Sequence, residues 1–377
     1  MNICFILPHI STIPRGGFRV VYDYANAFAA RGHKVFICYP YIFRYRSWIL
    51  GMLAHPIGTI KYFSSYLGML ITGKLRERNH GGGGGWHSLD SRVSCRYPFQ
   101  LAPWLPFIYP RGTRFIATMN WTSIAVSRFW CGSARKFYFI QGYENWAPFD
   151  DALVKKTYSL KLKKVAISKW LCEKVAEADE KAVCIPNGLD FQRFSLRNPI
   201  EGRNRYEIAM LWHPDGLKRA NDSLQALRIV HERFPNVHLT SFGVPERPDG
   251  WPEWITYVKQ PDAERHNRIY NEAAIFVASS EQEGWGLCPS EAMICGAALA
   301  CTDIGGYRSF AENGVNALMS PVYDVEALAD NVCRLIEDNQ LRIRIAKAGA
   351  EGIKKFTIES AVDKFLSVLG GDGYEIV

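Results

Sequence analysis

The hydrophobic pattern at the start of the chain predicts a strand, a helix and a second strand. Residues 2–7 and 34–39 are apolar runs of strand length, and apolar positions recur at helical spacing through residues 18–30. The turn before the helix contains Gly16 and Gly17. This order predicts a βαβ unit whose Gly-Gly turn lies at the end of the sheet where ligands of such units bind.

The alternation of short apolar runs and amphipathic segments continues along the chain. Strands are predicted at residues 114–119, 136–140, 206–212, 237–243, 255–258, 275–278 and 297–301, and helices at 222–234, 324–337, 339–355 and 357–369. A tight turn is expected at Pro186-Asn187-Gly188. Alternating strands and helices predict an α/β fold with parallel sheets, and 377 residues suit two domains better than one.

The segment that joins the strand at 275–278 to the next helix carries the strongest chemical signal. The helix is expected to begin near Pro289, so that Glu283 lies in the turn and Glu291 in the first helical turn. Free N–H groups at a helix N-terminus attract phosphate, whereas carboxylates can accept hydrogen bonds from sugar hydroxyls. The pattern predicts a nucleotide-sugar site, with one Glu for the ribose and one for the transferred sugar. Two solvated carboxylates in a surface turn are the alternative.

Charge and cysteine content bear on the binding partner and the cellular compartment of the protein. The net charge of +8 suits an anionic partner, and no nucleic-acid-binding motif is present. The 10 Cys form no C-x-x-C pair and no zinc-like cluster, so we expect a reducing compartment and no structural metal. The N-terminus lacks signal-peptide features, and no apolar run is long enough to cross a bilayer. These observations favour a cytoplasmic protein.

Residues 42–78 mix apolar and aromatic side chains with scattered Lys and Arg. Such a segment suits peripheral contact with the inner face of an anionic membrane; two helices packed on the N-terminal domain are an equally weighted interpretation. The five glycines at 81–85 predict a flexible loop, with a short lid on the acceptor side as the alternative.

Glu283-Gly-Trp-Gly-Leu-Cys-Pro-Ser-Glu291 resembles the E-x7-E motif of the retaining glycosyltransferases of family 4, in which Phe usually occupies the position of Trp285. The resemblance implies a GT-B fold, an α/β architecture of two doubly wound Rossmann-like domains facing a central cleft. It implies donor-binding roles for Gly17, Gly284, Trp285, Gly286, Leu287, Glu291, Gly305 and Gly306.

The resemblance also implies the domain organisation. Residues 1–192 are expected to form the N-terminal acceptor-side domain, with the helix in 357–377 crossing back to it. Residues 193–205 are the expected linker, and residues 206–356 the nucleotide-sugar donor domain.

Two loops depart from the family pattern. Lys218 matches the family's phosphate-binding Lys, but Arg219 stands where Gly is usual and His213 is the nearest counterpart of the preceding Arg. Diphosphate binding is expected to rest on Lys218, with Arg219 compensating; a solvated basic turn is the alternative. The loop that begins at Gln141 resembles the Phe-Ile-Gln-Asp-Tyr-Glu segment of a rhamnosyltransferase-like branch, with Gly142 in place of Asp. Acceptor-side roles are expected for Gly16, Gln141 and Tyr143.

The sequence has no Asp-x-Asp motif that could hold a divalent metal, so metal-independent transfer without a cofactor is expected. Glu283 would hold hydroxyls of the donor sugar and Glu291 the ribose, while Lys218 stabilises the leaving diphosphate. The predicted enzyme is a retaining hexosyltransferase that moves a hexose or deoxyhexose to a glycan or lipid-linked acceptor in cell-surface polysaccharide biosynthesis. A GT-B-fold sugar-nucleotide epimerase and a non-catalytic nucleotide-binding protein are the alternatives.

Overall fold

The computed structural model describes residues 1–41, 56–79 and 81–371, and the side chains of all of these except residues 56–62. The chain divides into two compact units. Unit 1 comprises Met1–Ile167, Leu171–Ile185 and Ala361–Val377, and unit 2 comprises Ser168–Trp170 and Pro186–Ser360. The domain boundaries expected from the family resemblance stay a prediction.

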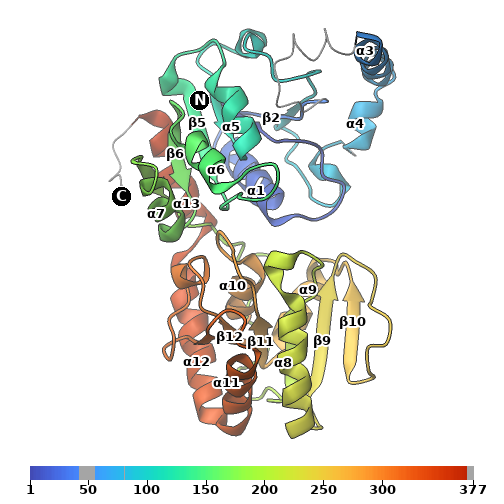
Figure 1. Cartoon of the computed structure of the whole chain (residues 1–377), viewed down its shortest axis with the longest axis vertical. Coiled ribbons are helices and arrows are strands. Elements are labelled where there is room, and N and C mark those ends of the chain that lie inside the picture. Colours follow the sequence, from blue (N-terminus) through green and yellow to red (C-terminus); the bar gives the residue numbers. More distant parts are fainter. Residues whose placement is uncertain (42–55, 80, 372–377) are drawn as a thin grey trace. The chain divides into compact units, whose positions relative to one another are not determined.

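Unit 1 is built on a seven-stranded parallel sheet in the order β3-β2-β1-β4-β5-β6-β7 (Figure 1). The strands are β1 Asn2–Ile6, β2 Lys34–Cys38, β3 Ser94–Arg96, β4 Arg114–Ala117, β5 Lys136–Ile140, β6 Lys163–Ala166 and β7 Ala182–Cys184. The central strands are buried on both faces, which explains why they appear in the sequence as continuous apolar runs.

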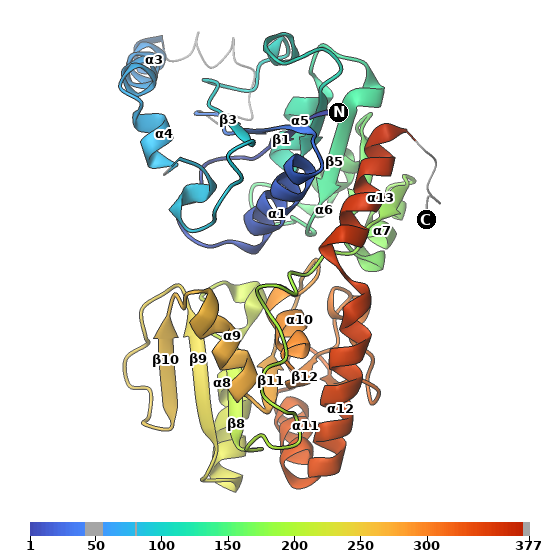
Figure 2. The ribbon, with the colours of Figure 1, turned by 180° about the vertical axis from the view of Figure 1, so that it is seen from behind.

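Helices cover both faces of this sheet, with α1 and α13 on one and α5 and α6 on the other (Figures 1 and 2). Phe365 of α13 makes ring contacts with Phe5, Phe28 and Phe139, so the C-terminal helix completes the core of unit 1. The helices that lie wholly or mostly in this unit are α1 Gly16–Ala30, α3 Pro56–Ile71, α4 Lys74–Arg78, α5 Asn120–Ser127, α6 Asp151–Tyr158, α7 Lys169–Ala176 and α13 Ile358–Gly370.

Unit 2 contains a six-stranded parallel sheet in the order β10-β9-β8-β11-β12-β13. Its strands are β8 Glu207–Leu211, β9 His238–Gly243, β10 Ile255–Lys259, β11 Ile275–Ala278, β12 Ala298–Thr302 and β13 Ala317–Ser320. Its helices are α8 Ala220–Arg233, α9 Ala263–Glu272, α10 Leu287–Ile294, α11 Val325–Glu337 and α12 Asn339–Gly352. In both units, two layers of helices enclose a parallel sheet, the architecture predicted by the alternating pattern.

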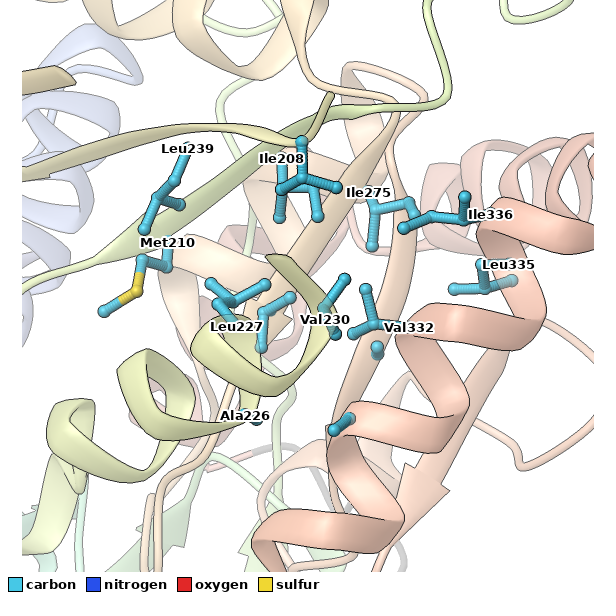
Figure 3. Packing of buried hydrophobic residues seen from close by; sticks show 14 of the residues in the cluster. Ile208, Met210, Ala226, Leu227, Val230, Leu239, Ile275, Val332, Leu335 and Ile336 are labelled. Carbon is cyan, nitrogen blue, oxygen red and sulfur yellow. The ribbon is translucent and has the colours of Figure 1, made fainter. Parts of the chain in front are cut away.

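Helices α8 and α11 pack together on one face of the unit 2 sheet, while α9, α10 and α12 lie on the other. In Figure 3, Val230 of α8 and Val332 of α11 point toward each other, over strand residues that include Ile208 and Ile275. This apolar layer fixes α8, and with it the loop between β8 and α8.

Three local expectations were wrong. Helix α1 begins at Gly16, so Gly16 and Gly17 form its first turn rather than a turn ahead of it. Residues 186–188 form no tight turn; a Cβ on Gly188 would lie 2.5 Å from Ile358 Cα, so close packing rather than turn geometry requires the glycine. Gly82, Gly83 and Gly84 are buried, and a Cβ on Gly84 would lie 1.8 Å from the carbonyl oxygen of Ser11, so the glycine loop is a packed element.

The basic aromatic segment at 42–78 is described in part, since residues 42–55 lie outside the described residues. Its described part contains α3 and α4, and the hydroxyl of Tyr66 donates to the carbonyl oxygen of Tyr97 at 2.8 Å. Among the residues that the structure describes, no helix has the length and apolar character needed to span a bilayer.

Candidate active site

Lys218 and Glu283 meet at the carboxyl end of the unit 2 sheet. Lys218 ends the 3-10 turn Gly216–Lys218 that follows β8, and Glu283 lies in the loop that follows β11. Their charged groups approach to 2.6 Å, from Lys218 Nζ to Glu283 Oε1. The side chains are 29% and 14% exposed, respectively. Two residues predicted for donor binding are thus brought together from neighbouring parallel strands.

Hydrogen bonds hold these two loops against each other. The N–H of Glu281 donates to the carbonyl oxygen of Leu217 at 2.8 Å. Ser279 Oγ donates to the carbonyl oxygen of Arg219 at 2.6 Å and accepts from the N–H of Ser223 at 3.1 Å. The Lys218–Glu283 pair therefore stands on a fixed backbone, as a site that must fit one ligand geometry requires.

Burial and the carboxylate act on Lys218 in opposite directions. Removal from water lowers the pKa of Lys218, but the acidic groups around it, Glu283 foremost, together raise it, so that the net pKa lies above its usual value. Lys218 is therefore a full positive charge at neutral pH, as binding of a diphosphate requires.

Two residues missed in the sequence orient Glu283. Ser280 Oγ donates to Glu283 Oε1 at 2.9 Å, and the hydroxyl of Tyr307 lies 2.9 Å from Ser280 Oγ and 3.4 Å from Glu283 Oε1. Burial raises the pKa of Tyr307 far above its usual value, so the phenol keeps its proton. Ser280 adjoins the motif and could have been considered from the sequence, whereas Tyr307 is 24 residues away from Glu283 and gives no comparable signal.

The glycines of the site are required by close packing. Gly286 has φ +110°, and a Cβ there would lie 2.4 Å from Tyr307 Cε1. A Cβ on Gly305 would lie 2.2 Å from Trp170 Cγ, and one on Gly306 would lie 2.3 Å from the carbonyl oxygen of Glu283. Gly306 thus allows the loop after β12 to pack directly on the motif, and Gly305 allows it to pack on Trp170.

The helix of the motif starts earlier than the sequence predicted. Helix α10 begins at Leu287, after Gly286 in a left-handed conformation, so Pro289 is its third residue and Glu291 lies beyond its first turn. Proline is tolerated there because the N–H groups of the first helical turn have no partner within the helix. Glu291 is 1% exposed and accepts a hydrogen bond from the hydroxyl of Tyr270 at 3.3 Å.

Trp285 is a core residue in this structure. Its side chain is 2% exposed, and its rings lie 5.3 Å from Phe310 and 5.0 Å from Phe356. The Trp285 ring therefore anchors the motif loop to the core, and a donor contact through Gly284, Trp285 or Leu287 stays a prediction.

Arg219 pairs with Asp222 rather than with Glu283. Its guanidinium forms two hydrogen bonds with Asp222, at 2.6 and 3.0 Å, and lies 4.5 Å from the ring centre of Tyr323. His213 Nδ1 accepts from the N–H of Asp215 at 3.1 Å. Lys218 is thus the cation that faces Glu283, and the compensating role of Arg219 stays a prediction.

The predicted acceptor-side residues lie in unit 1. Gly16 and Gly17 are exposed at the N-terminus of α1, and the amide of Gln141 lies 3.7 Å from where a Cβ on Gly17 would stand. Tyr143 is 5% exposed, and Lys174 Nζ lies 5.3 Å from its ring centre. Burial raises the pKa of Tyr143 to about 12. The structure brings Gly17 and Gln141 together and leaves the acceptor roles as predictions.

Within the parts of the chain that the structure describes, no group of three or more His, Cys, Asp or Glu side chains is arranged to hold a metal ion. The ten cysteines are free thiols.

Comparison with known proteins identifies the class. Residues 214–352 match the family model described as glycosyl transferases group 1. The chain is 27% identical over 185 residues to the phosphatidyl-myo-inositol mannosyltransferase of Mycobacterium leprae (46% of this chain, 50% of the relative). It is 35% identical over 206 residues to the D-inositol 3-phosphate glycosyltransferase of Frankia alni (47% and 49%). The chain therefore spans about half the length of the curated relatives that it matches.

Solved structures show the fold of the whole chain. Anabaena Alr3699/HepE in complex with UDP and glucose aligns with a TM-score of 0.68 and 15% identity, covering 98% of this chain and all of the other. TarM aligns with a TM-score of 0.70 and 12% identity over 98% of this chain and 99% of the other. The match to the glycosyl transferases group 1 model lies within unit 2, and the two parallel sheets of the chain have the GT-B fold. The resemblance to family 4 is confirmed; the rhamnosyltransferase-like branch stays a prediction.

Proposed function

We propose that this protein is a retaining glycosyltransferase that moves a hexose or deoxyhexose from a nucleotide-diphosphate sugar to a glycan or lipid-linked acceptor. The observation that carries the proposal is the Lys218–Glu283 pair, 2.6 Å apart at the carboxyl ends of β8 and β11. It presents one cation and one carboxylate at the edge of a parallel sheet where ligands of such folds bind.

The two members of the pair have separate roles when a donor binds. The diphosphate replaces Glu283 as the partner of Lys218, and Glu283 then accepts hydrogen bonds from hydroxyls of the donor sugar. Negative charge grows on the diphosphate as the glycosidic bond breaks, and Lys218 stabilises that charge together with the free N–H groups at the start of α10. Glu291 is the proposed ribose contact. No divalent metal takes part in the proposed step.

The setting of the reaction is proposed from the relatives and the sequence. One relative is named for phosphatidyl-myo-inositol, which is a lipid, and another for D-inositol 3-phosphate, which is not. These names support a lipid-linked or a free polar acceptor. We place the protein in the cytoplasm, peripherally at the inner face of the membrane, in cell-surface polysaccharide biosynthesis. A deoxyhexose such as rhamnose is among the candidate sugars because the loop at Gln141 resembles that of a rhamnosyltransferase-like branch, from which it departs at Gly142.

The direct test incubates the protein with UDP-, TDP-, GDP- and ADP-sugars and a bacterial lipid extract in EDTA, and assigns the anomeric configuration of the product by NMR. Transfer with retained configuration is expected in the wild type and is expected to be lost in Lys218→Ala. Arg233→Ala, which removes an exposed ion pair with Glu337 on the surface of unit 2, should leave transfer intact. Conversion of the donor into an epimer, with no acceptor glycosylated, would contradict the proposal.

A further inference from the structure

A group of exposed apolar side chains surrounds a short 3-10 turn in unit 1. Trp104, Phe107, Ile108 and Trp130 are 43%, 71%, 68% and 60% exposed, respectively. The ring of Trp130 lies 6.1 Å from that of Trp104 and 6.3 Å from that of Phe107. We call these four side chains the aromatic patch.

The backbone beneath the aromatic patch is well anchored. Leu105 and Pro106 within the turn are buried, and the N–H of Trp130 donates to the carbonyl oxygen of Pro103 at 2.7 Å. The patch is therefore presented by a packed turn rather than by a loose loop. Contiguous exposed apolar surface of this kind marks an interaction site.

The stretch of chain that contains the aromatic patch is strongly basic, which suits an anionic partner. Residues 24–143 contain fifteen Lys and Arg but only two acidic residues, Glu77 and Asp90. The chain as a whole carries a net charge of +8, so the positive excess is concentrated in this stretch. Arg111 and Arg128, close to the patch in sequence, are exposed. Trp beside exposed Arg suits the headgroup region of an anionic bilayer, where aromatic rings and cations are both stabilised.

A second apolar surface lies at the same extremity of unit 1. Helix α3 exposes Phe63, Leu67, Leu70 and Ile71, with 43% to 78% of each side chain accessible. In both ribbon views, this helix and the turn at Leu105–Ile108 reach the same end of the unit (Figures 1 and 2). An extended surface such as a bilayer suits two apolar groups at one end of the unit.

We propose that the aromatic patch docks unit 1 onto an anionic lipid bilayer, with the tips of Phe107, Ile108 and Trp130 at the headgroup level and Arg111 and Arg128 on lipid phosphates. The proposal deepens the membrane contact of the proposed function, on which it rests for its lipid setting, by extending it to residues beyond 42–78.

The test is flotation of the full chain with vesicles of phosphatidylcholine alone or mixed with phosphatidylglycerol, without any donor. Binding to the anionic vesicles is expected, and it should weaken at high salt. Phe107→Ser/Ile108→Ser should lower the affinity by about tenfold or more, and Arg128→Glu by roughly fivefold or more, because each cation near such a surface adds about that factor. Ile229→Ser/Val315→Ser and Arg228→Glu change exposed residues of unit 2 and serve as matched controls.

Three outcomes would overturn the proposal: the wild type ignores anionic vesicles at low salt, the patch variants bind as the wild type does, or the control variants lose as much affinity as the patch variants. Sedimentation of the protein without vesicles tests whether the patch instead joins copies of the chain. If the patch variants dissociate an oligomer and vesicles are not bound, the patch is an interface between copies of the chain. Since no donor is present, failure of vesicle binding and failure of sugar transfer are separate results.

Discussion

Gly306 packs directly on the backbone of Glu283: a Cβ on Gly306 would lie 2.3 Å from the carbonyl oxygen of Glu283 and 3.2 Å from its Cβ. The loop after β12 thus sets the position of the carboxylate that faces Lys218. The glycine at 306 is needed for the site to form, whether or not its own backbone touches a ligand.

Gly306→Ala should therefore displace the Glu283 loop. We expect a loss of about 1–3 kcal/mol in the free energy of unfolding, typical of overpacking, together with a clear loss of donor affinity. Thermal unfolding and nucleotide titration measure the two effects. Gly132→Ala is the control, because nothing lies within 4 Å of its added Cβ. Unchanged donor affinity in Gly306→Ala would show that the loop position does not govern the site.

Tyr307→Phe removes the hydroxyl shared with Ser280 and Glu283. The expected cost is about 1 kcal/mol of stability, the usual net value of a hydrogen bond, with slower transfer because Glu283 is held less firmly. Tyr24→Phe is the matched control: the Tyr24 hydroxyl is buried without a hydrogen-bond partner among the described residues, so its removal should be neutral or stabilising. Equal effects of the two substitutions would argue against the role given to Tyr307.

Arg219 adopts a left-handed conformation, with φ +46° and ψ +36°, at the position where the family usually has Gly. Arg219→Gly and Arg219→Ala both remove the ion pair with Asp222, but only glycine relieves the backbone. We therefore expect Arg219→Gly to be more stable than Arg219→Ala by about 1 kcal/mol. Both should bind donor far better than Lys218→Ala does. Donor binding that depends on Arg219 as strongly as on Lys218 would restore the compensating role predicted from the sequence.

Glu144 is expected to make unit 1 less stable as pH rises. Burial raises the pKa of Glu144 from 4.5 to about 8, although the N–H of Asn120, which donates to its Oε2 at 2.7 Å, acts in the opposite direction. Between these two values the unfolded chain has lost the proton and the folded chain keeps it, so the free energy of unfolding falls with pH, by at most about 1.4 kcal/mol per unit.

Glu144→Gln keeps an acceptor for the N–H of Asn120 and cannot ionise. Its free energy of unfolding should therefore exceed that of the wild type by a margin that grows between pH 4.5 and about 8 and is constant at higher pH. Denaturant unfolding at several pH values measures the difference. Glu177→Gln is the control. Lys174 holds the pKa of Glu177 below its usual value, so removing the Glu177 charge should give no gain in stability as pH rises. If the free energy of unfolding changes with pH in the same way for Glu144→Gln and the wild type, the prediction is wrong.

The strands that form the two sheet cores could be predicted from the sequence because they are continuous apolar runs. Lys136–Ile140 was predicted with its observed bounds, and most other predicted strands were within one or two residues of the observed ones. Elements with weaker patterns, including β13, α5, α6 and α9, were missed. Helix α9 has several charged and polar residues and packs on both β8 and α10.

The composition of the site was predictable, but its geometry was not. The spacing of Glu283 and Glu291 and the place of Lys218 mark the candidate site in the sequence, yet the burial of Glu291 and Trp285 depends on contacts with Tyr270, Phe310 and Phe356. The glycine run predicts a flexible loop because the packing of Gly84 against Ser11, some 70 residues earlier, leaves no local pattern in the sequence.

The central claim is that Lys218 binds the diphosphate of a nucleotide-sugar donor. The most direct measurement is the thermal stabilisation of the wild type and Lys218→Ala by UDP, TDP, GDP and ADP, each in EDTA. A ligand at a hundredfold excess over its dissociation constant stabilises the native state by about 2.7 kcal/mol, so one diphosphate should shift the wild type clearly and Lys218→Ala little. Equal stabilisation of both proteins, or a wild type that responds to none of the four, would contradict the account.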